Sequence, residues 1–290
     1  MDQSPSPMLI VQPTLEMAKM WSNDRLAPML RDTPALKDKV KDARSRDSGN
    51  TLYQKSFPGG YLAIVGANSP AGLASRPVRA VFFDEVDRYP ASAGSEGDPI
   101  NLGIARTKTF THNRKIVMVS TPTNKGASRI ETAFNQSDQR FYYVPCPDCD
   151  HSQKMQWQNV HWEKDRPETA EYICEECGSA WDDAKRYRAI RGGRWVATEK
   201  TNGTAGFHLS GLYSPWTPLG DIATDFMNAK KLPDTLRVFV NTTLAESWED
   251  QGERVSDLDV MDRSEPYGDK VDEGVVIITA GVDVQDDRLE

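Results

Sequence analysis

Apolar runs of strand length alternate with helical periodicity through the first half of the chain. Residues 78–83 are almost wholly apolar, which predicts a strand buried on both faces, and residues 8–12 predict a shorter one that ends at Pro13. Residues 15–30 have the pattern of an amphipathic helix that Thr14 could cap. Residues 115–119 predict another buried strand, so the chain begins as an open α/β sheet.

Turn and cap signals divide the chain further. Pro58-Gly59-Gly60 between two strand-like runs predicts a β-hairpin, and Ser128 with Glu131 has the spacing of a capping box. The segments that follow are predicted strands at 141–144, 153–157, 160–163, 195–197 and 206–209, and predicted helices at 68–76, 128–135, 182–191, 219–230 and 233–246. The strands at 153–157 and 160–163 are expected to form a ribbon hairpin.

Composition narrows the class of protein. The 290 residues carry a net charge of −8 and a mean hydropathy of −0.61. No apolar segment approaches the roughly 18 to 20 residues that cross a bilayer, and the amino terminus lacks a basic-then-apolar signal, so we expect neither a membrane partner nor export. The acidic balance argues against a wholly basic nucleic-acid-binding surface, although a local basic groove remains open.

Two carboxylates end the 78–83 strand. At the carboxyl end of a strand in an open α/β sheet, Asp84 could hold Mg²⁺ on a nucleotide while Glu85 polarises the attacking water, as in a Walker B motif. The alternative is a strand that simply runs into a solvated acidic turn. The 115–119 strand then ends in Ser120 and Thr121, where such ATPases sense the γ-phosphate.

The four cysteines form two Cys-x-x-Cys pairs. Two facing turns of this kind complete a tetrahedral, structural Zn²⁺ site, and four thiolates leave no open position. The alternatives are a pair of disulfides or a thioredoxin-like redox pair. His151 and His161 are interpreted as structural or solvent-facing residues, and Trp216 and Trp248 as packing residues rather than base-stacking platforms. The predicted zinc ligands are Cys146, Cys149, Cys174 and Cys177.

The end of the chain predicts a new domain. Residues 251–273 are polar and acidic, with the composition of a linker, and a strand-like run then ends in Asp283. A lone carboxylate at a strand end is also an ordinary terminator, so this position alone does not establish a metal site.

The order of motifs resembles one family. A strand ending Gln-Pro-Thr, then Phe-Phe-Asp-Glu-Val-Asp-Arg-Tyr-Pro, Val-Ser-Thr-Pro-Thr, Cys-Pro-Asp-Cys with Cys-Glu-Glu-Cys, and Gly-Val-Asp-Val-Gln together resemble the large terminase subunit of lambda-like tailed bacteriophages. The resemblance implies a P-loop-type ATPase core, incomplete here, with a zinc-ribbon-like insertion and the first strand of an RNase H-like nuclease. The implied domains are 1–145 (ATPase), 146–180 (zinc-ribbon-like insertion), 181–250 (continuation of the motor), 251–273 (linker) and 274–290 (nuclease).

The resemblance also implies an activity and its site residues. It implies an ATP-driven DNA-packaging motor with an endonuclease that cuts concatemeric viral DNA. Asp84 would be the magnesium ligand, Glu85 the catalytic carboxylate, Ser120 and Thr121 the coupling motif, and Asp283 the first nuclease ligand for Mg²⁺ or Mn²⁺. The implied partners are double-stranded viral DNA, the small terminase subunit, the portal or procapsid and further copies of the subunit, in the host bacterial cytoplasm.

Two departures from the family pattern shape the expectation for this chain. No Gly-x-x-x-x-Gly-Lys-Ser/Thr loop precedes Asp84, and the other nuclease acids of the family are expected beyond Glu290. We therefore expect an internal piece, from a decayed prophage gene or a partial reading frame, that is nearly inactive alone. The alternatives are a non-catalytic zinc-ribbon DNA-binding or assembly module on a degenerate ATPase scaffold, and a fragment of a cellular helicase.

Overall fold

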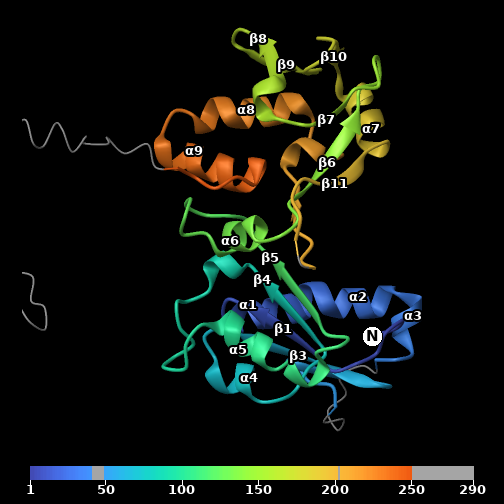
Figure 1. Cartoon of the computed structure of the whole chain (residues 1–290), viewed down its shortest axis with the longest axis vertical. Helices are drawn as coiled ribbons and strands as arrows, with labels where there is room; N and C mark the ends of the chain where they lie inside the picture. The colour runs from blue at the N-terminus through green and yellow to red at the C-terminus, as the bar shows by residue number, and fades with distance from the viewer. Residues whose placement is uncertain (41–48, 202, 250–290) are drawn as a thin grey trace, which may run out of the picture. The chain divides into compact units, whose positions relative to one another are not determined.

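The first half of the chain is a five-stranded sheet with helices on both faces. The computed structural model describes residues 1–40, 49–201 and 203–249 (Figure 1). The strand order is β2-β3-β1-β4-β5, with β1, β3, β4 and β5 parallel and β2 antiparallel to β3. The strands are β1 (Met8–Gln12), β2 (Gln54–Phe57), β3 (Gly60–Gly66), β4 (Ala80–Asp84) and β5 (Lys115–Val119). The predicted α/β class and hairpin are confirmed.

Each face of this sheet has its own apolar core. On one face, Ile10 and Ile64 pack with Leu26 of the first helical segment. On the other, Val81 and Phe83 pack with Leu73 of the fourth helix. The helical elements of this half are α1 (Leu15–Trp21), the π-helix η1 (Ser22–Leu26), α2 (Ala27–Asp32), α3 (Pro34–Lys37), α4 (Pro70–Ala74), η2 (Val86–Arg88), α5 (Pro99–Ala105), η3 (Lys108–Phe110) and α6 (Arg129–Asn135).

The helix starts follow the predicted caps. The backbone N–H of Met17 donates to Thr14 Oγ1 at 3.2 Å, and that of Glu131 donates to Ser128 Oγ at 3.1 Å. The Glu131 carboxylate accepts from the N–H of Gly126 instead of that of Ser128, so only half of the predicted capping box forms. The predicted helix at 15–30 extends to Asp32 and contains the π-turn η1, which a helical pattern of apolar residues does not reveal.

The burial predicted for the second apolar strand is wrong. β4 lies between β1 and β5 and is largely buried, whereas β5 is the outer strand of the described sheet and has Val119 55% exposed. An apolar run shows that a strand has side chains suited to burial. How much of their surface is buried depends on the strands and helices that pack beside it.

The second half holds two smaller sheets. β6 (Arg140–Pro145) pairs with β7 (Ser152–Lys154), β11 (Arg194–Ala197) and β12 (Phe207–His208), while β9 (Arg166–Ile173) pairs with β8 (Val160–Glu163) and β10 (Ala180–Trp181). The predicted hairpin between 153–157 and 160–163 is therefore wrong. The 3₁₀ turn η4 (Trp157–Asn159) separates the two strands, and each pairs with a different sheet.

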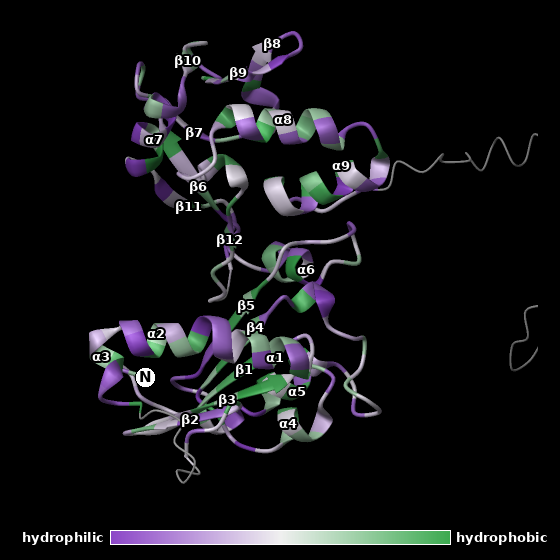
Figure 2. Ribbon diagram, turned by 180° about the vertical axis from the view of Figure 1, so that it is seen from behind, coloured by the Kyte–Doolittle hydropathy of each residue, from purple (hydrophilic) through white to green (hydrophobic). Residues whose placement is uncertain are grey.

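Helices complete this half around an aromatic core. They are α7 (Asp183–Arg191), η5 (Gly211–Tyr213), α8 (Leu219–Ala229), α9 (Pro233–Phe239) and the π-helix η6 (Val240–Leu244). Hydrophobic and hydrophilic residues alternate along α8 in Figure 2, and its Leu219 and Ile222 are buried with Tyr172 and Trp181. Trp216, predicted to pack, is instead 88% exposed in the loop before α8.

Residues Met1–Glu249 form one compact unit. None of the described helices has the length and apolarity required to cross a bilayer. The predicted linker at 251–273, the strand after it and Asp283 lie outside the described residues, and the proposed domain boundaries stay predictions.

Candidate functional site

The acidic site lies where the parallel strands β1, β4 and β5 end together. Asp84 is the register partner of Val119, so Glu85 and Ser120 each come one residue further on. On the other side of β4, Phe83 is the partner of Val11, which brings Gln12 beside Asp84. The structure thus places Asp84, Glu85 and Ser120 at one edge of the sheet, where ligands bind in open α/β folds.

A buried glutamine holds the first carboxylate. Gln12 is 2% exposed, and its Nε2 donates to Asp84 Oδ2 at 2.9 Å. The hydroxyl of Tyr89 donates to the carbonyl of Val11 at 2.7 Å, and burial raises the pKa of that phenol, which therefore stays protonated. Both contacts tie the end of β1 to the loop after β4, and they leave Asp84 Oδ1 for another ligand.

Glu85 has an unusual backbone conformation. Its φ of 55° and ψ of 51° lie in the left-handed region, which costs a non-glycine residue roughly 1 kcal/mol. This conformation breaks the strand and starts η2. The side chain is 32% exposed and lies 3.4 Å from the Arg88 guanidinium, a weak pairing that water screens. Glu85 is therefore accessible at the rim of the acidic site.

Asp87 connects the loop after β4 to the loop after β5. Its N–H donates to Ser120 Oγ at 3.3 Å, and its carboxylate accepts from Thr123 Oγ1 at 2.9 Å and from the N–H of Ile130 at 2.8 Å. Ser120 Oγ in turn donates to the carbonyl of Thr121 at 2.9 Å. Asp87 therefore fixes the Ser120-Thr121 turn relative to Glu85.

A second set of bonds joins this turn to the end of the described chain. Asn241 is buried in η6, and its Nδ2 donates to the carbonyls of Pro122 at 2.6 Å and Thr123 at 2.7 Å. The N–H of Trp248 also donates to the carbonyl of Thr123, at 2.9 Å. Any displacement of the Ser120-Thr121 turn would therefore strain or break the hydrogen bonds that Asn241 and Trp248 make with the residues directly after it.

Sequence reasoning missed Gln12, Asp87 and Asn241 as site residues. Gln12 and Asp87 both belong to the motifs that predicted the site. Gln12 is a polar residue at the end of an apolar strand, and Asp87 is an acid three residues after Asp84, so each could have been predicted as a site residue. Asn241 lies 118 residues from its acceptor in Thr123, and no local pattern predicts such a contact.

The thiol cluster consists of all four cysteines. Their sulfurs lie within 4.8 Å of one another, and the described cysteines are all free thiols. Sγ of Cys146 is 3.8 Å from Sγ of Cys177, and Sγ of Cys149 is 3.9 Å from Sγ of Cys174. Thiolates about 2.3 Å from a tetrahedral zinc ion stand about 3.8 Å apart, so the residues fit Zn²⁺ better than disulfides.

The surroundings of the thiol cluster act unevenly on its sulfurs. A backbone hydrogen bond with His151 opposes the shift, but burial and the neighbouring thiols raise the pKa of Cys149 to about 12. Gln153 is fully buried, and its Nε2 donates to Cys174 Sγ at 3.2 Å while its Oε1 accepts from the N–H of Glu175 at 3.1 Å. Hydrogen bonds from the side chain and backbone of Ser179 lower the pKa of Cys177 to about 6. His151 contacts Glu175 at 3.2 Å instead of facing the sulfurs, and His161 is exposed.

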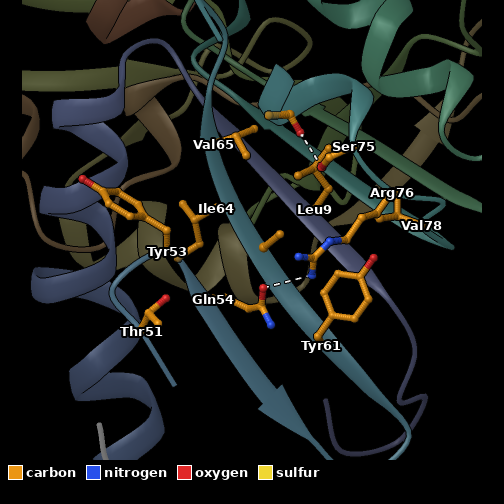
Figure 3. Close-up of a pocket in the computed structure, with 12 residues that line it drawn as sticks. Leu9, Thr51, Tyr53, Gln54, Tyr61, Ile64, Val65, Ser75, Arg76 and Val78 are labelled. Carbon is orange, nitrogen blue, oxygen red and sulfur yellow. Dashed lines mark hydrogen bonds between the residues drawn. The ribbon is translucent and has the colours of Figure 1, made fainter. Parts of the chain in front are cut away.

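A separate hollow of about 240 Å³ lies on the outer part of the large sheet (Figure 3). Its floor includes Leu9 and Val65, and the guanidinium of Arg76 lies 5.5 Å from the centre of the Tyr61 ring and donates to Gln54 Oε1 at 3.0 Å. None of the predicted site residues lines it. The acidic site lies at the strand ends and is separate from this hollow.

Comparison with known proteins identifies the family. Residues 1–195 match the family described as "Phage terminase large subunit gpA, ATPase domain", and residues 204–290 match "Terminase large subunit gpA, endonuclease domain". The chain is 30% identical to the large terminase subunit of Enterobacteria phage P21 over 97% of the chain and 48% of that relative. It is 29% identical to that of Escherichia phage lambda over the same shares.

The chain therefore spans about half the length of the curated relatives it matches. Among solved structures, the large terminase ATPase domain of Thermus phage P74-26 is 13% identical, with a TM-score of 0.45 over 85% of this chain and 78% of that one. From the match over residues 1–195, the chain belongs to the phage terminase large subunit gpA family, with a P-loop-type α/β core and a cysteine cluster that fits a zinc-ribbon-like insertion.

Proposed function

We propose that the chain is one part of an ATP-driven viral DNA-packaging enzyme, nearly inactive alone, and that the acidic site is where the complete enzyme hydrolyses ATP. One observation carries this proposal: Asp84 ends and Glu85 follows the inner parallel strand β4, level with Ser120 after β5, in a domain of the terminase ATPase family. Membership of that family implies that the substrate is double-stranded viral DNA. It also implies that the partners are a small subunit, a portal or procapsid and further copies of the subunit, in the host cytoplasm.

The residues of the acidic site have distinct roles in this proposal. Bound Mg²⁺ and ATP would supply the electrophilic phosphoryl group. Asp84 holds the cation through the oxygen that Gln12 leaves open. Glu85, at the accessible rim, accepts the proton of the attacking water, and its left-handed backbone turns the carboxylate out of the strand. The protein's own contacts already orient both carboxylates, which reduces the entropic cost of positioning them for the reaction.

Ser120 and Thr121 act as the coupling turn. Asp87 ties this turn to the acids, and Asn241 and the N–H of Trp248 tie it to the segment that precedes residue 250. A change of contacts at the γ-phosphate would thus move one hydrogen-bonded unit. This route gives ATP turnover a physical connection to the carboxyl-terminal part of the chain.

Zn²⁺ in the thiol cluster has a structural role. Cys146 and Cys149 are in the turn after β6, and Cys174 and Cys177 are in the turn after β9, so one ion would join the two small sheets. Four thiolates fill the tetrahedron and leave no position for water or substrate. A zinc ion held there would therefore stabilise the fold and take no part in hydrolysis.

The nuclease assignment of Asp283 rests on sequence. The endonuclease-domain match covers residues 204–290, and Asp283 ends an apolar run within it. Two-metal cleavage needs several carboxylates around ions about 3.5–4 Å apart, so Asp283 would be one ligand of a larger set for Mg²⁺ or Mn²⁺.

The test of the ATPase proposal is Glu85→Gln in a chimaera in which this chain replaces the matching half of the phage P21 large subunit. Turnover should fall roughly 100-fold or more while ATP binding survives, since the general base is lost and the Asp84 carboxylate remains. Asp225→Asn, at an exposed carboxylate of α8, is the matched control. Turnover within a few-fold of the parent would assign water activation to another residue.

The same chimaera tests the nuclease. Asp283→Ala should abolish Mg²⁺- or Mn²⁺-dependent plasmid cleavage and leave ATP hydrolysis unchanged. Undiminished cutting by the variant would show the assignment of Asp283 to be wrong.

A further inference from the structure

One face of the β11-β6-β12 sheet presents aromatic rings to solvent. Trp195 is the register partner of Tyr142, and Phe207 is the partner of Arg140, so these four side chains lie on the same face. We call them the ring face. Phe207 is 55% exposed and Trp195 37%, and both are on the outer strands β12 and β11 that flank β6.

The four side chains form one continuous row. The ring centres of Tyr142 and Trp195 are 5.2 Å apart, and those of Trp195 and Phe207 are 5.0 Å apart, in edge-to-face geometry. The Arg140 guanidinium lies 5.4 Å from the centre of the Phe207 ring and is held by Asp138 at 2.7 Å. The row is therefore rigid, and its exposed rings lose little rotational freedom when they bind another molecule.

The backbone is built to allow this row. A Cβ atom on Gly193 would lie 2.4 Å from the Tyr142 ring, so only glycine lets the start of β11 approach it. The Tyr142 hydroxyl donates to the carbonyl of Ile190 at 3.0 Å, which places the last turn of α7 at the edge of the ring face.

The chain that borders the ring face is strongly basic. Residues 184–198 contain five cations and no acid, in a protein with a net charge of −8. Lys185 pairs with Asp148 and the buried Arg186 with Asp183. Within the described parts of the chain, no carboxylate comes within ion-pair distance of the other three cations, which are Arg188, Arg191 and Arg194. Arg194 is the register partner of Tyr143 and therefore lies on the opposite face of the sheet, whereas Arg188 and Arg191 are in the last turn of α7, at the edge of the ring face.

We propose that the ring face, together with Arg188 and Arg191 of the last turn of α7, binds single-stranded nucleic acid. Exposed rings stack on unpaired bases whatever their identity, and neighbouring arginines neutralise the phosphates between them. The basic border favours a polyanion over a second copy of this acidic chain. Bases of a duplex are stacked on one another and leave no faces for the rings. The proposal rests on the proposed function, in which DNA is the polymer handled, but it requires neither hydrolysis nor cutting.

The experiment measures binding of fluorescein-labelled oligothymidylate, about 20 nucleotides long, to the 290-residue chain by fluorescence anisotropy at low salt. Phe207→Ala and Trp195→Ala should each weaken binding roughly five-fold or more, since each removes a stacking surface. Phe207→Tyr should restore it. Arg188→Gln and Arg191→Gln should each lower the slope of log Kd against log salt by about 0.7, the value for one phosphate contact on a single strand. Arg194→Gln, on the opposite face of the sheet, should leave the slope unchanged.

Trp216→Ala is the matched control, because Trp216 is the more exposed tryptophan but lies in a loop outside the sheet. It should bind like the parent. Thermal unfolding should match the parent for the arginine variants and Trp216→Ala, whose side chains are exposed, and should stay cooperative for Phe207→Ala and Trp195→Ala. The proposal is overturned if Phe207→Ala binds the oligonucleotide as tightly as the parent does, or if Trp216→Ala weakens binding as much as Phe207→Ala does. It is also overturned if a duplex of equal length binds more tightly than the single strand and its affinity is unchanged by Phe207→Ala. Each of these outcomes leaves the ATPase test unaffected.

Discussion

The acidic site and the thiol cluster are assembled in opposite ways. The thiol cluster takes all four ligands from two tight turns within residues 146–177, and the arrangement is closed. The acidic site collects Gln12, Asp84 and Ser120 from the ends of three separate strands and stays open at its rim. Short-range spacing therefore determines the first site, whereas the sheet as a whole determines the second.

The two sites nevertheless share one device. In each, a buried glutamine donates its amide hydrogen to a side chain that would bind the metal: Gln12 to the Asp84 carboxylate, through the oxygen that the cation would not use, and Gln153 to the Cys174 sulfur. Such outer contacts orient a ligand and hold its charged form. The comparison predicts that damage at the thiol cluster unfolds its surroundings, whereas damage at the acidic site changes chemistry more than fold.

The largest effect is expected from Cys174→Ser. Structural zinc sites contribute about 10–16 kcal/mol of apparent binding free energy, and this substitution removes one of four ligands from a buried position. Elemental analysis should show loss of bound zinc, and hydrogen exchange should show loss of protection across residues 146–181. His161→Ala, at an exposed histidine in the same region, should keep one zinc per chain. A zinc-free parent protein, purified under reducing conditions, would refute the site.

Asp87→Ala should have the next largest effect. It removes two acceptors at once, leaving the Thr123 hydroxyl and the N–H of Ile130 without their partner, at a cost of about 2–3 kcal/mol. Chemical denaturation should show this loss, and hydrogen exchange should locate it at the start of α6. Asp225→Ala should change stability by less than about 0.5 kcal/mol. Equal stability of Asp87→Ala and the parent would show that the two loops are not linked through this carboxylate.

The two glutamines provide the direct comparison of the sites. Gln153→Ala should weaken zinc affinity about 10- to 100-fold, measured by competition with a chromogenic chelator. Gln12→Ala should leave zinc affinity unchanged and lower the free energy of unfolding by about 1–2 kcal/mol, because it removes a buried hydrogen bond to a carboxylate. If Gln153→Ala bound zinc like the parent, the contact with Cys174 would be a packing contact only.

The same contrast explains what the sequence could predict. Cys-x-x-Cys spacing specified the thiol cluster because all its ligands lie on two local turns. The apolar run before Asp84 specified β4, but the exposure of β5 and the pairing of β7 with β6 depend on neighbours that a local pattern does not encode. The contacts of Asn241 and the ring face arise from strands that are distant in sequence, so no spacing rule could predict them.

The smallest effect concerns backbone strain. Glu85 and Ala245 both have left-handed backbones, with φ of 55° and 57°, one at the acidic site and the other at the end of η6. Glycine adopts this conformation without the Cβ clash, but it also gives the unfolded chain more freedom, so the net gain should be about 0.5–1 kcal/mol at each position. Ala245→Gly should therefore raise the free energy of unfolding. Glu85→Gly should be more stable than Glu85→Ala by a similar amount, since neither variant keeps the weak contact with Arg88.

Urea denaturation of the three variants makes the comparison. A gain at both positions would show that the strain at Glu85 is the ordinary cost of its backbone, retained because the carboxylate has to point out of β4. A gain at Ala245 alone would mean that the loop after β4 relaxes around Glu85, and the orientation assigned to its carboxylate would be wrong.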